Sequence, residues 1–403
     1  MESVIVVGGG LGGVRAVEAL RGKGYEGELT LLSAERHRPY DRPPLSKAVL
    51  AGESDDTTVD ADWDALRARL LLGERATGLR LAPGGGGTVA TTAGDLDFDG
   101  LVIATGATPV TLPGDGPQHV VRTIDDARAL RARLTAGARV VIVGAGWIGA
   151  EVATAAAKKG CAVTVVEAAD APLANAIGAE VGALTAPWYA EAGVELRTGV
   201  KVAEIEPGGL LLAGGERIDA DEVVVGVGVR PDLGWLDGSG VLVDRGVVTD
   251  ASFRVSTGGE DGPYRRDVVA VGDCAAWWSA RFGRRLLVEH WDTALNAPAV
   301  AAGTLLGEDA AYDAVPYFWS EQFGRMVQYV GHHPVAERMV RRGDPAGAKW
   351  AVCWLTGDRL EAILTVGTPR DMVQAKRLIA NRTPVDAAAL ADPSVPVRDA
   401  ARP

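Results

Sequence analysis

The chain has 403 residues, of which 47% are hydrophobic and 23% charged, a composition typical of a folded globular protein and not of a disordered one. Its formal net charge of −12 argues against nucleic-acid binding, which requires a basic face. Cys161, Cys274 and Cys353 have neither C-x-x-C nor metal-ligand spacing, so we expect no disulfide framework, no metal site and no dithiol centre.

The chain begins with a short apolar run, Val4 to Val7, which predicts a buried strand. The run is too short for a signal-peptide core, and no positively charged segment precedes it. The sequence contains no stretch of 18 apolar residues that could span a membrane. We therefore expect a cytoplasmic protein without a membrane span.

A glycine motif, Gly8-x-Gly10-x-x-Gly13, separates this strand from a predicted helix. In a dinucleotide-binding fold the first glycine allows a tight turn, the second lets backbone approach a pyrophosphate, and the third lets helix and strand pack closely. The phosphates then lie at the positive N-terminus of the helix. Glu35, after the next apolar run, supplies the carboxylate expected about one unit later.

The same order of elements returns at Val140, where Gly144-x-Gly146-x-x-Gly149 follows a second apolar run. Glu167 ends the run after that. A carboxylate at this position accepts hydrogen bonds from a ribose 2′-hydroxyl and repels a 2′-phosphate, so we expect NADH and not NADPH. A solvated charge at a strand end is the alternative interpretation of Glu167.

Two dinucleotide-binding domains imply two dinucleotides. FAD with NADH is the sensible pair, because a second nicotinamide would also move only hydride, whereas a flavin can release electrons singly.

The rest of the chain shows shorter signals. We predict buried strands within 101–106, 223–228 and 267–273, a hairpin turn at 83–87 and a loop at 258–263. From about Tyr317 aromatic residues become denser and strand-like runs alternate with charged turns, which predicts a separate α+β domain.

Four segments carry a family signature: Pro39-Tyr-Asp-Arg-Pro-Pro-Leu-Ser-Lys47, Ala104-Thr-Gly106, Val271-Gly-Asp273 and Pro316-Tyr-Phe-Trp-Ser-Glu-Gln322. Their order and spacing resemble those of the NADH-dependent ferredoxin reductases, the group that includes putidaredoxin reductase and the reductase components of aromatic-ring dioxygenases. The resemblance covers about residues 3 to 380.

The resemblance implies an α/β fold like that of glutathione reductase, with two dinucleotide-binding (Rossmann-type) domains and a C-terminal α+β domain. The FAD-binding domain would comprise 1–108 and 238–312, and the NADH-binding domain 109–237. An interface domain would follow at 313–403, with a loosely held tail from about residue 387.

The resemblance also assigns the site residues. FAD would be held by Gly8, Gly10, Gly13, Glu35, Arg42, Lys47, Thr105, Gly106 and Asp273, with Glu289 and Trp291 near the isoalloxazine. NADH would be held by Gly144, Gly146, Ile148, Gly149, Glu151, Glu167 and Gly228. The catalytic candidates are Lys47, Trp291 and Trp319.

Each assignment to a polar or aromatic side chain has a simpler alternative. Lys47 would place a fixed ammonium group near the flavin, which favours an anionic reduced ring, or it is a surface lysine. Trp291 and Trp319 would be flat walls for ring stacking, or they are core residues. Asp273 would accept a hydrogen bond from a ribityl hydroxyl, or it is a helix N-cap.

These features predict a flavoprotein reductase that takes hydride from NADH onto FAD and passes single electrons to a [2Fe–2S] ferredoxin that supplies an oxygenase. The region of Leu45 to Lys47 holds no cysteine, so we expect no thiol relay. The alternatives are an NADH oxidase or diaphorase with a small-molecule acceptor, and a redox-responsive binding protein resembling apoptosis-inducing factor.

The partner is expected to be an acidic ferredoxin that docks transiently. Residues 315–403 contain 12 Lys and Arg against 9 Asp and Glu, which is basic relative to the acidic whole, and charge complementarity speeds and orients docking. Two arginine clusters, Arg281/Arg284/Arg285 and Arg338/Arg341/Arg342, are candidates for the docking face; solvated arginines are the alternative. The sequence is compatible with a monomer or a homodimer.

Overall fold

The computed structural model describes residues 1–259 and 262–402, and its contacts divide into two compact units. Unit 1 comprises residues 1–41, 57–108 and 230–316, and unit 2 comprises residues 42–56, 109–229 and 317–403. The division into three domains stays a prediction. Part of the predicted loop at 258–263, residues 260–261, lies outside the described residues.

The described part of unit 1 is built on a ten-stranded sheet with the order β22-β21-β18-β19-β20-β7-β1-β2-β3, and β17 pairs with β18. The strands from β20 to β3 are parallel to one another. The bounds are β1 (Ser3–Val7), β2 (Glu28–Ser33), β3 (Arg69–Leu72), β7 (Gly100–Ile103), β17 (Val243–Asp244), β18 (Gly246–Thr249), β19 (Arg254–Ser256), β20 (Tyr264–Ala270), β21 (Ala275–Ser279) and β22 (Arg284–Leu286).

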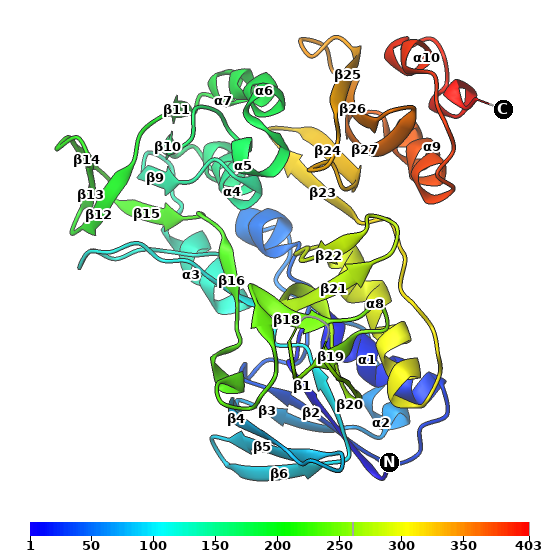
Figure 1. The fold of residues 1–403 in the computed structure, drawn as a ribbon. Coiled ribbons are helices and arrows are strands. Elements are labelled where there is room, and N and C mark those ends of the chain that lie inside the picture. The colour runs from blue at the N-terminus through cyan, green and yellow to red at the C-terminus, as the bar shows by residue number, and fades with distance from the viewer. Residues whose placement is uncertain (260–261, 403) are drawn as a thin grey trace. The chain divides into compact units, whose positions relative to one another are not determined.

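Both faces of the parallel part of this sheet are covered, which explains why β1 is apolar throughout. Val4 and Val6 pack in one core cluster with α1 (Leu11–Gly22) and α8 (Trp291–Leu305), which contact each other (Figure 1). Ile5 and Val7 point to the other face, because side chains alternate along a strand. There they pack with a meander of β4 (Ala76–Leu81), β5 (Gly87–Thr91) and β6 (Gly94–Phe98).

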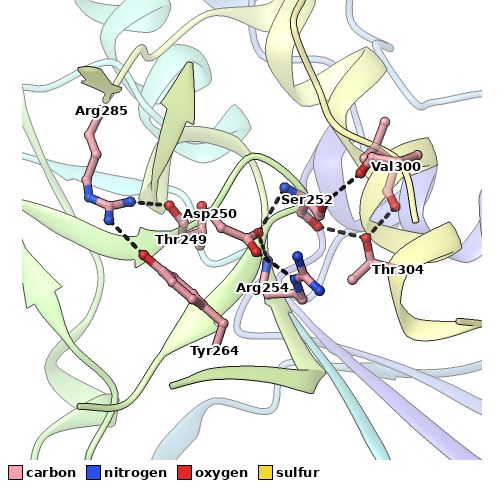
Figure 2. Close-up of polar contacts among 9 residues, drawn as sticks. Thr249, Asp250, Ser252, Arg254, Tyr264, Arg285, Val300 and Thr304 are labelled. Atoms are coloured by element: carbon pink, nitrogen blue, oxygen red, sulfur yellow. Dashed lines mark hydrogen bonds and ion pairs between the residues drawn. The ribbon is translucent and has the colours of Figure 1, made fainter. Parts of the chain in front are cut away.

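Within unit 1, hydrogen bonds hold the C-terminal half of α8 to the turn between β18 and β19 (Figure 2). The Thr304 hydroxyl donates to the Ser252 carbonyl oxygen at 2.8 Å and contacts the Val300 carbonyl oxygen at 3.1 Å. Asp250 in turn accepts from the backbone N–H groups of Ser252 (2.9 Å) and Arg254 (3.0 Å). This network ties the helix to the turn between β18 and β19.

A second, smaller parallel sheet forms part of unit 2, with the order β11-β10-β9-β15. Its strands are β9 (Arg139–Val143), β10 (Ala162–Val166), β11 (Glu195–Arg197) and β15 (Glu222–Val225). As in unit 1, a helix packs on one face, α4 (Trp147–Lys158), and a meander on the other. The meander comprises β12 (Val202–Glu206), β13 (Gly209–Leu212) and β14 (Arg217–Asp219). The predicted repeat of strand, glycine turn, helix and strand is therefore confirmed.

An antiparallel sheet with the order β23-β24-β27-β26-β25 follows in unit 2, with α9 (Pro369–Ala380) packed on β24 and β27. Its strands are β23 (Tyr317–Gln322), β24 (Arg325–Gly331), β25 (Arg338–Gly343), β26 (Trp350–Thr356) and β27 (Arg359–Val366). The remaining described elements are η1 (Leu45–Val49), α2 (Trp63–Leu66), β8 (Ala107–Pro109), α3 (Ile124–Arg133), α5 (Ala174–Ile177), α6 (Ala179–Gly182), η2 (Ala183–Thr185), α7 (Ala186–Glu191), β16 (Val229–Pro231), η3 (Gly234–Leu236), η4 (Gly272–Cys274), α10 (Ala387–Ala391) and η5 (Val397–Ala400).

The prediction of a loosely held tail from residue 387 is wrong for the part of the tail that the structure describes. Arg342, on β25, is 4% exposed and donates to the carbonyl oxygens of Leu390 (3.2 Å), Asp392 (2.5 Å) and Val395 (2.8 Å). Leu390 and Val397 are fully buried. The tail lacks an apolar pattern of its own, and its anchor comes from a distant strand. No helix in the described part of the chain is long and apolar enough to cross a membrane.

Candidate functional site

The first glycine motif lies between β1 and α1 and leaves no room for side chains at two of its three glycines. A Cβ on Gly8, whose φ is +122°, would lie 2.0 Å from the Ala104 carbonyl oxygen, and one on Gly13 would lie 1.9 Å from the Gly8 carbonyl oxygen. Gly10 differs, because a Cβ there would meet nothing within 4 Å. The chain itself requires glycine at the first and third positions and leaves the second one open.

The second motif, between β9 and α4, repeats this geometry. Gly144 has φ +102° and would place a Cβ 2.5 Å from the Gly226 carbonyl oxygen, and a Cβ on Gly149 would lie 1.9 Å from the Gly144 carbonyl oxygen. A Cβ on Gly146 would have its nearest neighbour at 3.9 Å. In each motif, packing within the protein therefore does not require the second glycine.

The open glycines are the N-cap residues of α1 and α4, and neither cap makes a side-chain hydrogen bond to the first turn. The first N–H groups of a helix have no partner within the helix and favour an anion. A glycine that nothing in the protein requires, at a helix start that no side chain caps, fits backbone contact with a pyrophosphate. The residues present thus fit a dinucleotide at each motif.

Three segments distant in sequence meet at the start of α1. A Cβ on Gly8 would lie 3.0 Å from the Thr105 backbone nitrogen, and one on Gly12 would lie 3.7 Å from a Val271 methyl group and 3.8 Å from the Ala294 carbonyl oxygen. The segments around Thr105, Val271 and Ala294 therefore adjoin the first cradle. Two of them are the predicted motifs at 104–106 and 271–273.

Two exposed apolar side chains belong to segments beside the second cradle. Ile148, in the first turn of α4, is 42% exposed, and Val227, after β15, is 40% exposed. A Cβ on Gly144 would lie 3.4 Å from a Val227 methyl group. Exposed aliphatic groups beside a helix start suit the rings of a dinucleotide. Ile148 is among the residues predicted to hold NADH, and Val227 is not, because the sequence shows it only as an apolar residue between two glycines.

The carboxylate of Glu167 lies directly after β10 and contacts the second glycine turn. It accepts hydrogen bonds from the backbone N–H groups of Ala145 at 2.7 Å and Ala169 at 2.8 Å. An ionised carboxylate has about four acceptor positions, so these bonds leave capacity for a ribose hydroxyl. They also fix the orientation of the group.

Glu35 lies two residues beyond β2 and is half-buried. Its carboxylate accepts a hydrogen bond from the Tyr40 hydroxyl, and its backbone N–H donates to the Ser33 hydroxyl at 3.3 Å. Tyr40 is 7% exposed. Tyr40 lies in the family motif at 39–47, but the sequence predicts no role for it, because a hydrogen bond between side chains five residues apart has no local signature here.

Lys47 and Glu151 form an ion pair in unit 2, with Nζ 2.8 Å from a carboxylate oxygen. Glu151, on α4, is 3% exposed and also accepts hydrogen bonds from the hydroxyls of Ser46 and Ser320, the latter at 2.6 Å. The Ser320 hydroxyl accepts from the Gln322 amide at 3.2 Å. The network therefore joins η1, α4 and β23. It makes Glu151 a residue that positions Lys47; its predicted contact with NADH stays a prediction.

The two predicted tryptophans are both half-buried. Trp291 is the first residue of α8, and its indole N–H donates to the Asp41 carboxylate at 3.0 Å. Trp319, on β23, stacks on Tyr317 with ring centroids 6.1 Å apart, and the Lys376 ammonium group lies 5.5 Å from the Tyr317 ring centre. Trp291 also packs against the core cluster of unit 1, and the contact of either tryptophan with the flavin stays a prediction.

The remaining predicted residues occupy turns and strand ends. The Thr105 hydroxyl donates to the Asp232 carbonyl oxygen at 2.8 Å, and Arg42 donates to the Arg122 carbonyl oxygen at 2.5 Å. Gly106 (φ +67°) and Gly228 (φ +109°) have the left-handed backbone that favours glycine, and Glu289 is exposed.

Asp273 lies inside the short helix η4, whose N-cap is Val271. The alternative interpretation of Asp273 as a helix N-cap is therefore wrong, because the helix starts two residues earlier than that interpretation needs. Its neighbour Cys274 is fully buried, and burial raises the pKa of the Cys274 thiol to about 11. That sulfur is protonated and unreactive at neutral pH. Among the described residues no group of His, Cys, Asp and Glu side chains could hold a metal ion.

Comparisons with known proteins agree with this geometry. Residues 2–297 match the family model described as "Pyridine nucleotide-disulphide oxidoreductase", and residues 317–401 match "Reductase C-terminal". The ferredoxin–NAD(+) reductase component of the anthranilate 1,2-dioxygenase system of Burkholderia cepacia is 38% identical, over 98% of each chain.

Two solved structures have the same fold along their whole length. The crystal structure of Fdr9 has a TM-score of 0.92 and 49% identity, with 100% of each chain covered. Putidaredoxin reductase in its covalent complex with putidaredoxin has a TM-score of 0.92 and 32% identity, with 99% of this chain and 97% of that chain covered.

Proposed function

The chain belongs to the pyridine nucleotide-disulphide oxidoreductase family, and from that premise we propose that it is an NADH-dependent, FAD-containing reductase that passes electrons to a ferredoxin serving an oxygenase. The observation that carries the proposal is the pair of glycine cradles, each with an open second glycine at an uncapped helix start. Two such cradles suit one flavin dinucleotide and one nicotinamide dinucleotide.

Bound FAD supplies the conversion between a two-electron donor and a one-electron acceptor. The protein's own residues bind and orient. The first cradle, with Glu35, Thr105, Gly106 and Asp273, would hold FAD, together with Arg42 and Lys47. The second cradle, with Ile148, Val227, Gly228 and Glu167, would hold NADH.

Lys47 is the residue we assign to charge stabilisation. A fixed ammonium group near an electron-accepting ring favours the anionic product, and the buried Glu151 carboxylate keeps the Lys47 side chain extended toward α4. Trp291 and Trp319 are assigned to stacking. No proton transfer by a side chain is needed for hydride transfer between stacked rings.

Thiol chemistry takes no part in the proposed reaction, although other members of the family use it. Cys274 is buried with a raised pKa, and Cys353 is also fully buried with a pKa raised by burial to about 12. The segment η1 (Leu45–Val49), where a thiol relay would need a cysteine, contains none and has Lys47 at its centre. We infer direct electron transfer from flavin to acceptor.

The partner is proposed to be an acidic [2Fe–2S] ferredoxin, but the docking arginines need revision. Arg342 is buried and holds the tail, so its proposed docking role is wrong. Arg281 is 13% exposed and pairs with Asp313 at 2.7 Å. Arg285 donates to Thr249 and to the Tyr264 hydroxyl, as Figure 2 shows. These three arginines serve the fold.

Exposed basic residues remain on α9, where Arg370 and Arg377 face solvent. Lys376 lies over the Tyr317 ring, which stacks on Trp319. A cationic helix is complementary in charge to an acidic protein. We therefore place the docking face on α9.

The test is steady-state NADH oxidation by the FAD-loaded protein with a panel of ferredoxins, rubredoxins and oxygen. We expect a [2Fe–2S] ferredoxin to accelerate turnover, less so as salt rises. Fast reoxidation by oxygen that ferredoxin does not accelerate would favour the oxidase or diaphorase. Slow turnover with every acceptor, together with a change in mass on NADH addition, would favour a redox-responsive binding protein. Sizing and cell fractionation test a monomeric or homodimeric state and a cytoplasmic location, both of which we propose.

A further inference from the structure

Tyr40 and Asp41 are adjacent, and their side chains contact two different residues of the candidate FAD site in unit 1. The Tyr40 hydroxyl donates to the Glu35 carboxylate. The Asp41 carboxylate accepts the indole N–H of Trp291 at 3.0 Å. Glu35 follows β2, where the adenosine ribose is expected, whereas Trp291 is assigned to the isoalloxazine. One dipeptide therefore supports residues assigned to both ends of the cofactor.

The backbone of this dipeptide is held in place, so its side chains start from fixed positions. Tyr40 pairs with Thr58 in an antiparallel bridge. The Asp41 N–H donates to the Thr57 carbonyl oxygen at 2.8 Å, and the Val59 N–H donates to the Pro39 carbonyl oxygen at 2.9 Å. Short strand-like pairing on both sides of Tyr40 thus fixes the direction in which Tyr40 and Asp41 point.

Trp291 lies at the N-terminal end of a helix that contains a proline. Its N-cap residue, His290, makes no side-chain cap hydrogen bond, and Pro298 lies inside the helix. Proline has no N–H and so removes the hydrogen bond to the carbonyl group four residues earlier, which here belongs to Ala294. The bonds of Thr304 fasten only the other half of α8.

The first turn of α8 nevertheless lies beside the FAD motifs. Ala294, one turn after Trp291, is within 4.0 Å of the place where a Cβ would stand on Gly12, and the same distance applies to Gly272. Gly12 belongs to the start of α1, and Gly272 precedes Asp273. A small rotation of this turn would therefore move the Trp291 ring relative to the cradle.

We propose that Asp41 is a positioning residue that sets the orientation of Trp291 against the flavin, while Tyr40 sets that of Glu35 at the ribose. The inference rests on the proposed function. A carboxylate acceptor makes a stronger hydrogen bond to an indole N–H than a neutral group. The hydrogen bond to Asp41 engages the edge of the indole ring, and aromatic rings stack through their faces. The two contacts together fix both ends of FAD relative to one rigid dipeptide.

The experiment compares four variants, Asp41→Ala, Asp41→Asn, Trp291→Phe and Tyr40→Phe, together with the double variant Asp41→Ala/Trp291→Phe. The readouts are the visible absorption spectrum of bound FAD, the FAD dissociation constant from flavin fluorescence, and the indole N–H resonances of the tryptophans by NMR. Circular dichroism checks that each variant folds.

We expect Asp41→Ala and Trp291→Phe to change the flavin spectrum in the same way, and the double variant to add nothing, because both single changes remove one contact. Asp41→Asn keeps an acceptor oxygen and should retain most of the parent spectrum. Tyr40→Phe should weaken FAD binding by about tenfold, which is the size of one lost hydrogen bond to a charged group, with the flavin spectrum unchanged.

The proposal is overturned if Asp41→Ala leaves the flavin spectrum unchanged, or if its effect persists in the Trp291→Phe background. A protein that binds no FAD would instead refute the proposed function. In that case the indole N–H resonance of Trp291 still tests the contact in the apoprotein, since Asp41→Ala must shift it.

Discussion

The ammonium group of Lys47 lies 2.8 Å from the carboxylate of Glu151, and that carboxylate is 3% exposed. The two residues come from η1 and α4, which are about a hundred positions apart in sequence. An ion pair in a buried setting costs desolvation energy that good geometry and added hydrogen bonds offset. Here Ser46 and Ser320 supply the added bonds. The position of Lys47 therefore depends on Glu151.

Removing one partner of this ion pair should lower the free energy of unfolding more than removing both partners. Glu151→Leu leaves the Lys47 charge without its acceptor, and we expect the free energy of unfolding to fall by about 3 kcal/mol. The double variant Lys47→Met/Glu151→Leu should recover much of that loss. Urea denaturation measures both. The single variant Lys47→Met completes the comparison. If the double variant loses as much stability as Lys47→Met and Glu151→Leu do in sum, the two residues are not coupled.

The glycine motifs predict opposite results for neighbouring positions. Gly13→Ala would place a methyl group 1.9 Å from the Gly8 carbonyl oxygen, and we expect a loss of stability of about 3 kcal/mol. Gly10→Ala meets nothing, so the protein should fold with nearly unchanged stability and bind FAD at least about tenfold more weakly. Gly149→Ala and Gly146→Ala are the matched pair for NADH. If Gly10→Ala binds FAD with unchanged affinity, FAD does not bind at that glycine motif.

Glu167 is expected to set the choice of nucleotide. Glu167→Ser removes the acceptor for the ribose 2′-hydroxyl and the charge that repels a 2′-phosphate, so kcat/KM for NADH should fall by about tenfold and that for NADPH should rise. Glu195→Gln is the control, because Glu195 is exposed and on the neighbouring strand β11. A parent enzyme that prefers NADPH tenfold would refute the assignment.

Arg341 and Arg342 are adjacent on β25 but should respond differently to alanine. Arg342→Ala leaves Asp371 and three tail carbonyl groups without their donor, and we expect a loss of about 3 kcal/mol. Arg341 pairs with Glu180, and both side chains are exposed, so its loss should stay below about 1 kcal/mol. Denaturation midpoints measure both. Docking tests therefore use Arg341→Ala and Lys376→Ala, and not Arg342.

The buried cysteines should resist alkylation in the native protein. With the pKa of Cys274 raised to about 11, roughly one molecule in a thousand carries the thiolate at pH 8. Iodoacetamide at that pH should label Cys161, which is partly exposed, and leave the other two and ferredoxin reduction intact. If ferredoxin reduction is lost as Cys274 becomes labelled, a thiol takes part in the reaction.

The sequence predicted the glycine turns because the order of strand, glycine turn and helix is visible in the residue pattern. Gly13 meets the Gly8 carbonyl oxygen of the same turn, whereas Gly8 meets Ala104, which is distant in sequence. The repeated fold follows from the same signal. The position of Glu167 directly after β10 was predicted for this reason too, since the apolar run before it marks the strand; its contact with NADH stays a prediction.

The contacts that could not be predicted join segments that only the fold brings together. Asp41 contacts Trp291 across 250 positions, and Arg342 reaches a tail 48 to 53 residues away. Nothing in an arginine doublet distinguishes the member that points inward from its exposed neighbour, because that depends on which face of β25 is covered. The docking role of Arg342 and the loose tail were wrong for this one reason.

The anchored tail determines how the protein can be joined to a redox partner in a single chain. A ferredoxin fused after residue 402 would be tethered to a fixed point beside β27, because Val385 pairs with Ala401 and the neighbouring Pro384 pairs with Arg359 of β27. The length of an added flexible linker then sets the effective concentration of the partner at the docking face. Trimming residues 387–402 to shorten that tether would remove the carbonyl groups that Arg342 binds, and so would destabilise the sheet that carries the proposed docking helix.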